Sequence, residues 1–502
     1  MIDTFLEYKI QNKLKFYQVL RSNNSMRIED LTKKLNLSEF AIKSLTNTLN
    51  IDLLGLAKIE KNQQFLSITI QNNVNTIKLL HCIYNESAVL QCLKFMITNE
   101  ANEPFSTFTK DAFLSKSSAY RTRTICHEYL QTIGLNIDNN KVIGDEYRIR
   151  FLIALLYYKY GIDCCHIDLD SIRLARKFIL STNHTIDLKF LENTVNEYGY
   201  FECLLILSWK RKEHTPYLKK IDDFQKLKKS FIYRDLKIHL KETIEQSLNI
   251  NFSEEDYDYI YLAYCNTNSC VLADKWTQSD IDYIHQIIFT NTLFADLLER
   301  FTLKFKKNLV ENRAMKLALI YFYKKFIYEL QCISPDICFY LDSKNDPLTL
   351  KTFHHVSNLL DLWKTDHRIQ YPISIDHAHY LSIQMESILH QFINPIHLII
   401  ISDLVVELEV MRLNLTRNFS NYRIKVTPFI LNTEKIDFLY TLEDSVIIVN
   451  QKFKNIMMNL DISKQNTIVP VNVEFNSFDM NEIQKSILYY EEKSFLKLIN
   501  SL

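Results

Sequence analysis

Glycine is scarce in this sequence, and its distribution limits the folds open to the chain. The 502 residues contain only Gly55, Gly134, Gly144, Gly161 and Gly199, so the last 303 residues contain none. A loop that cradles phosphate groups needs glycine, because the ligand approaches the backbone too closely for a side chain. The sequence therefore excludes a Walker A loop and a dinucleotide-binding fingerprint. Scarce glycine with abundant leucine, isoleucine, lysine and glutamate is typical of a mostly helical protein.

Composition predicts a chain of several folded domains. Hydrophobic residues make up 47% and aromatic residues 12% of the sequence, and a chain of this length has roughly three to five domains. Apolar runs such as FLIALLYY (Phe151–Tyr158) are shorter than the roughly 20 residues of a membrane span, and the N-terminus has no signal-peptide pattern. The ten cysteines are scattered without a CxxC pair. We therefore expect reduced thiols in a cytoplasmic protein, with no membrane contact and no cofactor.

Charge is unevenly distributed although the net charge is zero. Residues 1–162 hold 20 lysines and arginines against 15 acidic residues, and the rest of the chain holds 39 against 44. This mild asymmetry is compatible with an N-terminal region that faces nucleic acid.

The beginning of the chain has the pattern of a small DNA-binding module. Apolar periodicity predicts three short helices within residues 11–50, the last over Leu37–Asn50 with Ser38 as its N-cap. The alternating stretch LAKIEKNQQFLSITIQ predicts a β-hairpin with a polar tip. We expect one shared core of Leu31, Leu35, Phe40, Ala41, Leu45 and Leu49. Three helices and a hairpin favour a winged helix-turn-helix over an arbitrary helical bundle, with Ser38, Lys43 and Asn47 as candidate DNA contacts.

The same pattern recurs directly afterwards. The stretches ESAVLQCLKFMITN and FSTFTKDAF predict two helices, and Ser115–Ile133 predicts a third. GLNIDNNKVIGDEYRIR then predicts a hairpin whose tip is Asp138-Asn139-Asn140. We expect the third helix to turn four residues toward the core, namely Ile125, Tyr129, Leu130 and Ile133. The sequence thus predicts a second winged helix-turn-helix.

The third helix of this second module has a polar and basic front. Ser115 can cap its first turn, and the candidate DNA contacts are Lys116, Ser117, Ser118, Tyr120, Arg121 and Arg123. A recognition helix enters the major groove with its N-terminal residues first, so groups that read bases belong there. The alternative is an ordinary surface helix. A basic first turn opposes the helix dipole, which favours the DNA-binding interpretation.

The remainder divides into a helical part and an α/β part. From about Ile167 to His390 the apolar spacing of three and four predicts two helical bundles that meet near residue 290. After Pro395, short apolar strands alternate with helices, which predicts a small parallel sheet covered by helices. We therefore expect a mainly α, multidomain protein with a C-terminal α/β domain.

Five stretches of the sequence are distinctive together: SKSSAYRTRT, VIGDEYRIRFLIALLYYKYGI (Val142–Ile162), LILSWKR (Leu205–Arg211), LKKSFIYRD (Leu227–Asp235) and the stretch with DKWTQSDI. In these stretches and in the order of its elements, the sequence resembles the Mga/AtxA family of Gram-positive virulence regulators, and within it the RofA-like branch. The resemblance implies two DNA-binding modules, two regulation domains of the sugar phosphotransferase system (PRDs) and a domain like a phosphotransferase IIB component (EIIB-like). The boundaries that we expect are 1–72, 73–165, 166–288, 289–392 and 393–502.

The resemblance also implies partners. Proteins of this family dimerise and control genes for surface adhesins, pili and toxins. We therefore expect double-stranded promoter DNA, a second copy bound through the C-terminal and PRD-like domains, and phosphotransferase proteins such as HPr as partners. A working IIB domain carries a phosphate-accepting cysteine after its first strand, but here the stretch reads LIIISDLVVELEV and no cysteine follows Cys338. We expect this domain to serve contacts and not thiol phosphotransfer.

Regulation domains of this kind carry phosphorylatable histidines. The candidates are His214, His239, His354, His355, His377 and His379. His214 stands out in the first bundle, because Lys210, Arg211 and Lys212 precede it and could bind a phosphate. Each of these histidines could equally be an ordinary surface or core residue.

Two other functions compete with the DNA-binding regulator. An RNA-binding antiterminator also contains regulation domains, but it begins with a strand-rich module, whereas this chain begins with helices. A metal enzyme could use the DHAH stretch (Asp376–His379) with His367, but positions two apart on a helix do not face each other. Serine lacks a GxSxG-like context and no nucleophile–base pattern emerges, so we do not expect an enzyme.

Overall fold

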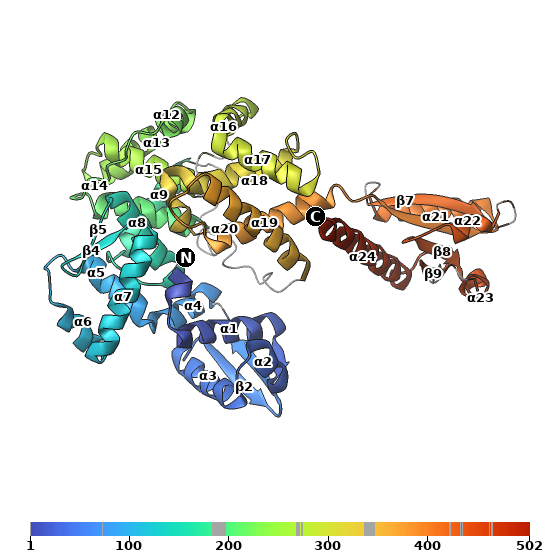
Figure 1. Cartoon of the computed structure of the whole chain (residues 1–502), viewed down its shortest axis with the longest axis horizontal. Helices are drawn as coiled ribbons and strands as arrows, with labels where there is room; N and C mark the ends of the chain where they lie inside the picture. Colours follow the sequence, from blue (N-terminus) through green and yellow to red (C-terminus); the bar gives the residue numbers. More distant parts are fainter. Residues whose placement is uncertain are drawn as a thin grey trace. The chain divides into compact units, whose positions relative to one another are not determined.

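The computed structural model describes residues 2–502 except 73, 183–196, 268–271, 273–274, 336–346, 421–422, 432, 434, 461 and 463–464. It forms two compact units (Figure 1). The first comprises Met1–Phe301, Leu309–Asp346 and Phe353–Ser382, and the second comprises Thr302–Asn308, Pro347–Thr352 and Ile383–Leu502. Helices dominate the first unit and a sheet organises the second, which confirms the expected mainly α, multidomain class.

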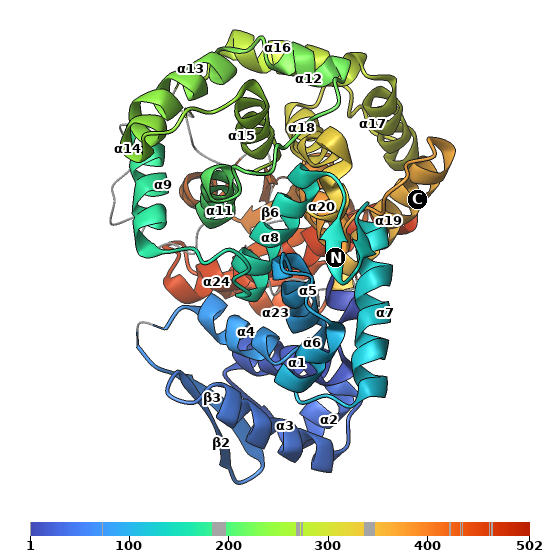
Figure 2. The same ribbon diagram turned by 90° about the vertical axis from the view of Figure 1, so that its left-hand side faces the viewer.

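The first module has the predicted three helices and hairpin. After the 3-10 turn η1 (Ile2–Phe5), its elements are α1 (Tyr8–Asn23), β1 (Ser25–Arg27), α2 (Ile28–Leu35), α3 (Glu39–Asp52), β2 (Ala57–Asn62) and β3 (Phe65–Ile70). The hairpin pairs Asn62 with Phe65 across a two-residue turn, and β1 adds a third antiparallel strand on the β3 edge. Figure 2 shows the hairpin beside α3.

One side chain in this module differs from the expectation. Phe40 was expected in the shared core, yet its side chain is 83% exposed. Ile42 is buried in its place, together with Leu45 and Leu49. Ile42, Leu45 and Leu49 are three and four residues apart, so they satisfy the helical period as well as the predicted set does. Leu35 and Ala41 are half-buried at the edge of the core.

The second module repeats the order of three helices and a hairpin, but a further helix precedes them and its sheet has two strands instead of three. Its elements are α4 (Thr76–Asn85), α5 (Ala88–Thr98), α6 (Phe105–Asp111), α7 (Lys116–Thr132), β4 (Asn136–Asp138) and β5 (Lys141–Ile143). Asn139 and Asn140 turn the hairpin with φ of 45° and 62°, as asparagine tolerates in tight turns. The predicted hairpin was too long, because EYRIR belongs to the next helix, α8 (Glu146–Tyr160). This helix is buried along most of its length, which explains why its sequence lacks a polar face.

A long helical region follows α8 and lies mostly in the first unit, whereas Thr302–Asn308, Pro347–Thr352 and the residues from Ile383 onward belong to the second. Its first half contains α9 (Leu169–Thr182), α11 (Glu197–Lys210), α12 (Asp222–Leu227), α13 (Phe231–Leu240), the π-helix η2 (Lys241–Glu245), α14 (Gln246–Leu248) and α15 (Glu254–Asn266). Its second half contains α16 (Gln278–Thr290), α17 (Thr292–Phe305), α18 (Arg313–Phe326), the 3-10 helix η4 (Ile327–Cys332), α19 (Pro347–Asp366) and α20 (Ile375–His390). Helix α11 packs on both α8 and α15, so the helical region is built directly onto the helix that follows the second module.

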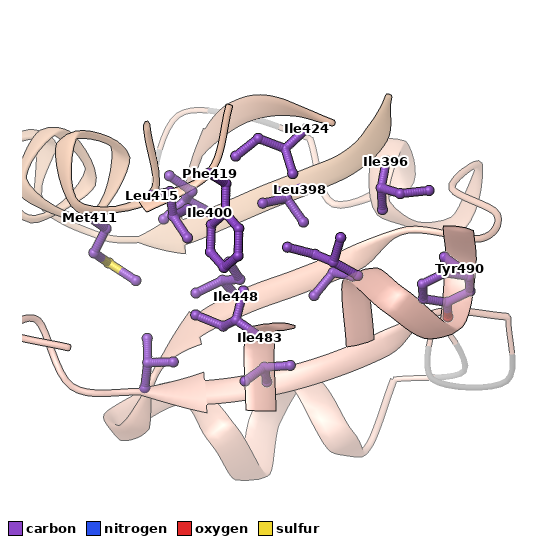
Figure 3. Close-up of a cluster of buried hydrophobic side chains, with 14 of the residues drawn as sticks. Ile396, Leu398, Ile400, Met411, Leu415, Phe419, Ile424, Ile448, Ile483 and Tyr490 are labelled. Carbon is purple, nitrogen blue, oxygen red and sulfur yellow. The ribbon is translucent and has the colours of Figure 1, made fainter. Parts of the chain in front are cut away.

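The second unit is a three-layer α/β domain. Four parallel strands run in the order β7-β6-β8-β9, from β6 (Ile396–Ser402), β7 (Ile424–Ile430), β8 (Val446–Asn450) and β9 (Thr467–Val471). The helices between and after them are α21 (Val405–Asn418), α22 (Asp437–Tyr440), α23 (Lys454–Met458) and α24 (Ser477–Asn500). Helices α21 and α24 cover one face of the sheet, where Met411, Leu415, Ile483 and Tyr490 join the strand residues in one cluster (Figure 3). Helices α22 and α23 cover the other face.

Candidate DNA-binding surface and its connections

Helix α7 of the second module is positioned by its cap and its buried side. Ser115 Oγ accepts a hydrogen bond from the backbone N–H of Ser118 at 3.2 Å, as predicted for the N-cap. The side that faces the module is formed by Ala119, Thr122, Cys126, Tyr129, Leu130 and, after the helix, Ile133. Ile125, expected in the core, is half-buried. The core residues come mostly from the later turns, which leaves the front of the helix open.

Five of the six predicted contacts on α7 are exposed: Lys116, Ser117, Ser118, Tyr120 and Arg121. Arg123 is half-buried, with its guanidinium carbon 5.8 Å from the centre of the Phe105 ring of α6. The Tyr120 ring lies 5.6 Å from that same ring. Arg123 is thus held against α6, whereas Arg121 extends from the exposed side and makes no ion pair with any residue that the structure describes.

The first module presents α3 in the same way. Ser38 Oγ accepts a hydrogen bond from Ala41 N at 3.2 Å, and Lys43 and Asn47 are exposed on the outer side. Its hairpin is fixed to α3 by Asn50, whose amide donates to Ile59 O at 2.9 Å and accepts from Ile59 N at 2.7 Å. The sequence did not predict this pair of hydrogen bonds, because nothing in the local sequence distinguishes Asn50 from its polar neighbours.

Arg148 of α8 connects the second module with the helical region. Its side chain is buried, and it donates to Ile133 O at the end of α7 at 3.1 Å and to Tyr328 O of η4 at 3.0 Å. Its guanidinium carbon also lies 4.5 Å from the centre of the Tyr371 ring. Tyr328 and Glu329 both have φ of 55°, so η4 bends where the arginine binds. One planar cation therefore holds the end of the candidate recognition helix and a bend about 180 residues later in the chain.

Arg150, two residues further along α8, makes a second connection. It is fully buried and donates to the backbone oxygens of Arg211 at 3.0 Å and His214 at 2.7 Å. Glu146 bonds Arg150 at 3.0 Å and receives two hydrogen bonds from the Arg211 side chain, at 2.8 and 2.9 Å. The EYRIR stretch that carried the resemblance thus connects the second module with the helical region, and its Glu146 carboxylate is shared by Arg150 and Arg211.

The candidate histidines differ in how they are placed. His214 is 40% exposed, with Nε2 3.7 Å from a Glu100 carboxylate oxygen, and it lines a cleft of about 780 Å³. Lys210, Arg211 and Lys212 line the same cleft. His354 is exposed, and His239 and His355 are half-buried. His377 and His379 are 1% and 5% exposed, so both are enclosed in this conformation.

The residues of the competing metal site are engaged with other side chains. A carboxylate oxygen of Asp376 lies 3.4 Å from the buried ammonium of Lys159, which also bonds Asp3 at 2.8 Å. His367 Nε2 lies 2.7 Å from an Asp296 carboxylate oxygen. Among the described residues there is no group of three or more histidine, cysteine or acidic side chains that could hold a metal ion. In the same part of the chain, no helix is both long and apolar enough to cross a membrane.

Two helix-turn-helix modules, one of them joined through buried arginines to a helical region, define a multidomain transcriptional regulator. Comparison with protein families agrees with this class. Residues 72–157 match the Mga helix-turn-helix domain, and residues 176–388 match the PRD domain of the M protein trans-acting positive regulator (MGA). No curated protein matches the chain. The chain belongs to the Mga/AtxA family of PRD-containing regulators, which indicates a regulator and not an enzyme.

Proposed function

We propose that this protein is a dimeric, cytoplasmic regulator that binds promoter DNA through α3 and α7 and responds to phosphorylation by sugar phosphotransferase proteins. Genes for surface adhesins and pili are the proposed targets, as in the RofA-like branch. The observation that supports DNA binding is the exposed front of α7. Its exposed side chains all carry a hydroxyl or a basic group, namely Lys116, Ser117, Ser118, Tyr120 and Arg121. Such donors match base edges and phosphates in a major groove.

The test compares Arg121 with Arg123 on the same promoter fragments, found by mapping bound DNA across the genome. We expect Arg121→Ala to weaken binding by about 1–3 kcal/mol if the arginine reads a base, or to lower the salt slope by about one unit if it binds a phosphate. Arg123→Ala should also weaken binding, partly by loosening α7 from Phe105.

The comparison variant is Lys43→Ala, because Lys43 is the only lysine or arginine of α3. We expect it to weaken binding less than either arginine variant. If both arginine variants bind like wild type at moderate salt while Lys43→Ala loses DNA binding, α7 is not the dominant recognition helix.

Support for regulation comes from the contacts of the PRD region. His214 shares its cleft with three basic side chains, and its backbone oxygen accepts a hydrogen bond from Arg150 of α8. A phosphate adds roughly −1.5 to −2 charges and bonds lysine and arginine. A change at His214 therefore has a short route to the helix that follows the second module.

Support for a dimer comes from the second unit. Helix α21 buries Leu408, Met411 and Leu415 against the sheet, yet it leaves Val406 76% and Leu413 54% exposed. No cysteine follows β6, the first strand of this unit, and Ser402 at the end of that strand is fully buried. An apolar surface on a domain without a phosphate-accepting cysteine favours a contact role.

A further inference from the structure

The exposed side of α3 begins with an aromatic ring. Phe40 stands two positions after the N-cap, and its side chain is 83% exposed. Lys43 and Asn47 are also exposed and follow at spacings of three and four residues. The three side chains therefore form one stripe along the outer side of the helix. The opposite side carries the buried residues Ile42 and Leu45.

The two modules present their recognition helices through the same turn. In the first, Asn36 has φ of 52° and is followed by Leu37 and the cap Ser38; in the second, Phe113 has φ of 52° and is followed by Leu114 and the cap Ser115. The caps therefore align the helices position by position. Two residues after the cap stands Phe40 in α3 and Ser117 in α7, and both are exposed.

The chemistry at these equivalent positions is different. Helix α7 offers hydroxyl and basic groups, which bond polar base edges and phosphates, whereas a phenyl ring can make only apolar contacts. In the major groove, the C5-methyl group of thymine is the apolar feature that marks a base pair, and phenylalanine is among the side chains that contact it. Asn47, on the same stripe, is of the type that bonds adenine through two hydrogen bonds. Both side chains therefore suit A·T base pairs.

We propose that Phe40 is a specificity-determining residue that packs on a thymine methyl group, so that the first module reads A·T pairs while the second reads polar base edges. This inference rests on the proposed DNA binding by the first module. The promoter site would then have two parts of different chemistry, one read by α3 and one read by α7. The ring supplies recognition without charge, so its contribution should not depend on salt concentration.

The experiment uses the full-length protein and a promoter fragment that it binds. Each thymine is replaced in turn by deoxyuridine, which keeps the base pair and removes only the methyl group. We expect about fourfold weaker binding at one or two positions, the fold-change that corresponds to about 0.8 kcal/mol for each buried CH₂-sized group. Phe40→Ala should weaken binding to the unmodified fragment by at least this factor. At the sensitive positions, the variant should show no further loss with deoxyuridine.

Two other variants complete the test. Phe40→Leu should keep part of the sensitivity, because leucine can still contact a methyl group. Leu54→Ala is the matched control, since Leu54 is also 83% exposed but lies in the turn after α3, and it should bind like wild type. Helix content measured by circular dichroism should be unchanged in all three variants, because the altered side chains lie outside the core.

The outcomes separate the inference from the proposed function. If wild type binds the fragment but no thymine is sensitive, or if Phe40→Ala keeps the wild-type sensitivity, the inference is overturned while DNA binding stands. If Phe40→Ala binds DNA normally and instead loses self-association, the ring faces a second copy and the inference is again overturned. If the full-length protein binds no promoter fragment at all, the proposed function fails together with the inference.

Discussion

At the scale of single residues, the backbone at Gly161 shows how closely α8 and α4 are packed. Gly161 ends α8 with φ of 70°, and its N–H bonds Tyr157 O at 3.1 Å. A Cβ atom there would lie 2.4 Å from Cγ of His81, whose Nε2 is 3.0 Å from Tyr158 O. Burial lowers the pKa of His81, which favours the neutral ring at this position. Glycine is thus favoured both by the left-handed backbone and by the closeness of the neighbouring ring.

We predict that Gly161→Ala destabilises the first unit more than Gly55→Ala does. Both glycines have positive φ, so each substitution should cost about 1–2 kcal/mol from the backbone alone. A Cβ at Gly55 would meet nothing within 4 Å, whereas at Gly161 it would displace the His81 ring. Calorimetric unfolding of the two variants measures the difference. Equal losses would show that the ring moves aside without cost.

At the scale of elements, the buried arginines of α8 connect the second module with the helical region. Arg148 bonds the end of α7 and the bend of η4, and Arg150 bonds the segment around His214. Hydrogen bonds from a charged group are stronger than neutral ones, so these contacts hold their carbonyl partners firmly. Movement in the PRD region can therefore reach the second module through α8.

We predict that Arg148→Ala loosens both ends of this connection at once. Removing a buried charged donor that bonds carbonyl groups should cost about 1.5–3 kcal/mol per lost hydrogen bond. Hydrogen exchange should accelerate around Ile133 and around Tyr328, although these segments are far apart in the sequence. Arg148→Lys should recover only part of the protection, because an ammonium cannot reproduce the planar fork.

Arg121→Ala is the control for this experiment, since Arg121 is exposed on α7 and should leave exchange unchanged at both segments. Faster exchange at Ile133 alone would mean that Arg148 stabilises the second module without linking it to η4.

At the scale of the whole molecule, the proposed regulation involves two events, phosphorylation and self-association. Phosphorylation would act on histidines of the PRD region, and self-association would use the second unit. The exposures of the candidates allow these ideas to be tested in the intact chain.

We predict that His214 accepts phosphate when the full-length protein is incubated with phosphoenolpyruvate and the general phosphotransferase proteins. Mass mapping under conditions that spare phosphohistidine should locate the label, and His214→Ala should remove it. His377→Ala should leave the label unchanged, because His377 is 1% exposed. The absence of label anywhere between residues 176 and 388 would leave the helical region as a structural scaffold.

We predict that Val406→Glu or Val410→Glu converts a dimer into a monomer in sedimentation experiments. Val406, Val410 and Leu413 are exposed and lie four and three positions apart, so they form one apolar stripe on α21. A carboxylate placed in an apolar contact loses its hydration without compensation. Leu54→Glu is the control, since Leu54 belongs to the first module. A dimer that survives both α21 variants would move the interface to the helical region.

Local sequence determined much of this architecture. The caps Ser38 and Ser115, the Asn139-Asn140 turn and the helical or alternating periods predicted the elements and their order, because capping, turn geometry and apolar period act within a few residues. The parallel C-terminal sheet was predictable from the same local patterns, because strands that alternate with helices can be connected in few ways other than as a parallel sheet.

Only the tertiary structure decided which side of α3 faces the core and what the arginines of EYRIR bind. Phe40 and Ile42 fit the helical period almost equally well, and packing against the rest of the module chose Ile42. Arg148 and Arg150 look like surface charges in the sequence, but Arg148 bonds Tyr328, 180 residues away, and Arg150 bonds His214, 64 residues away. Such contacts depend on how whole elements pack together, and no local pattern of residue types encodes them.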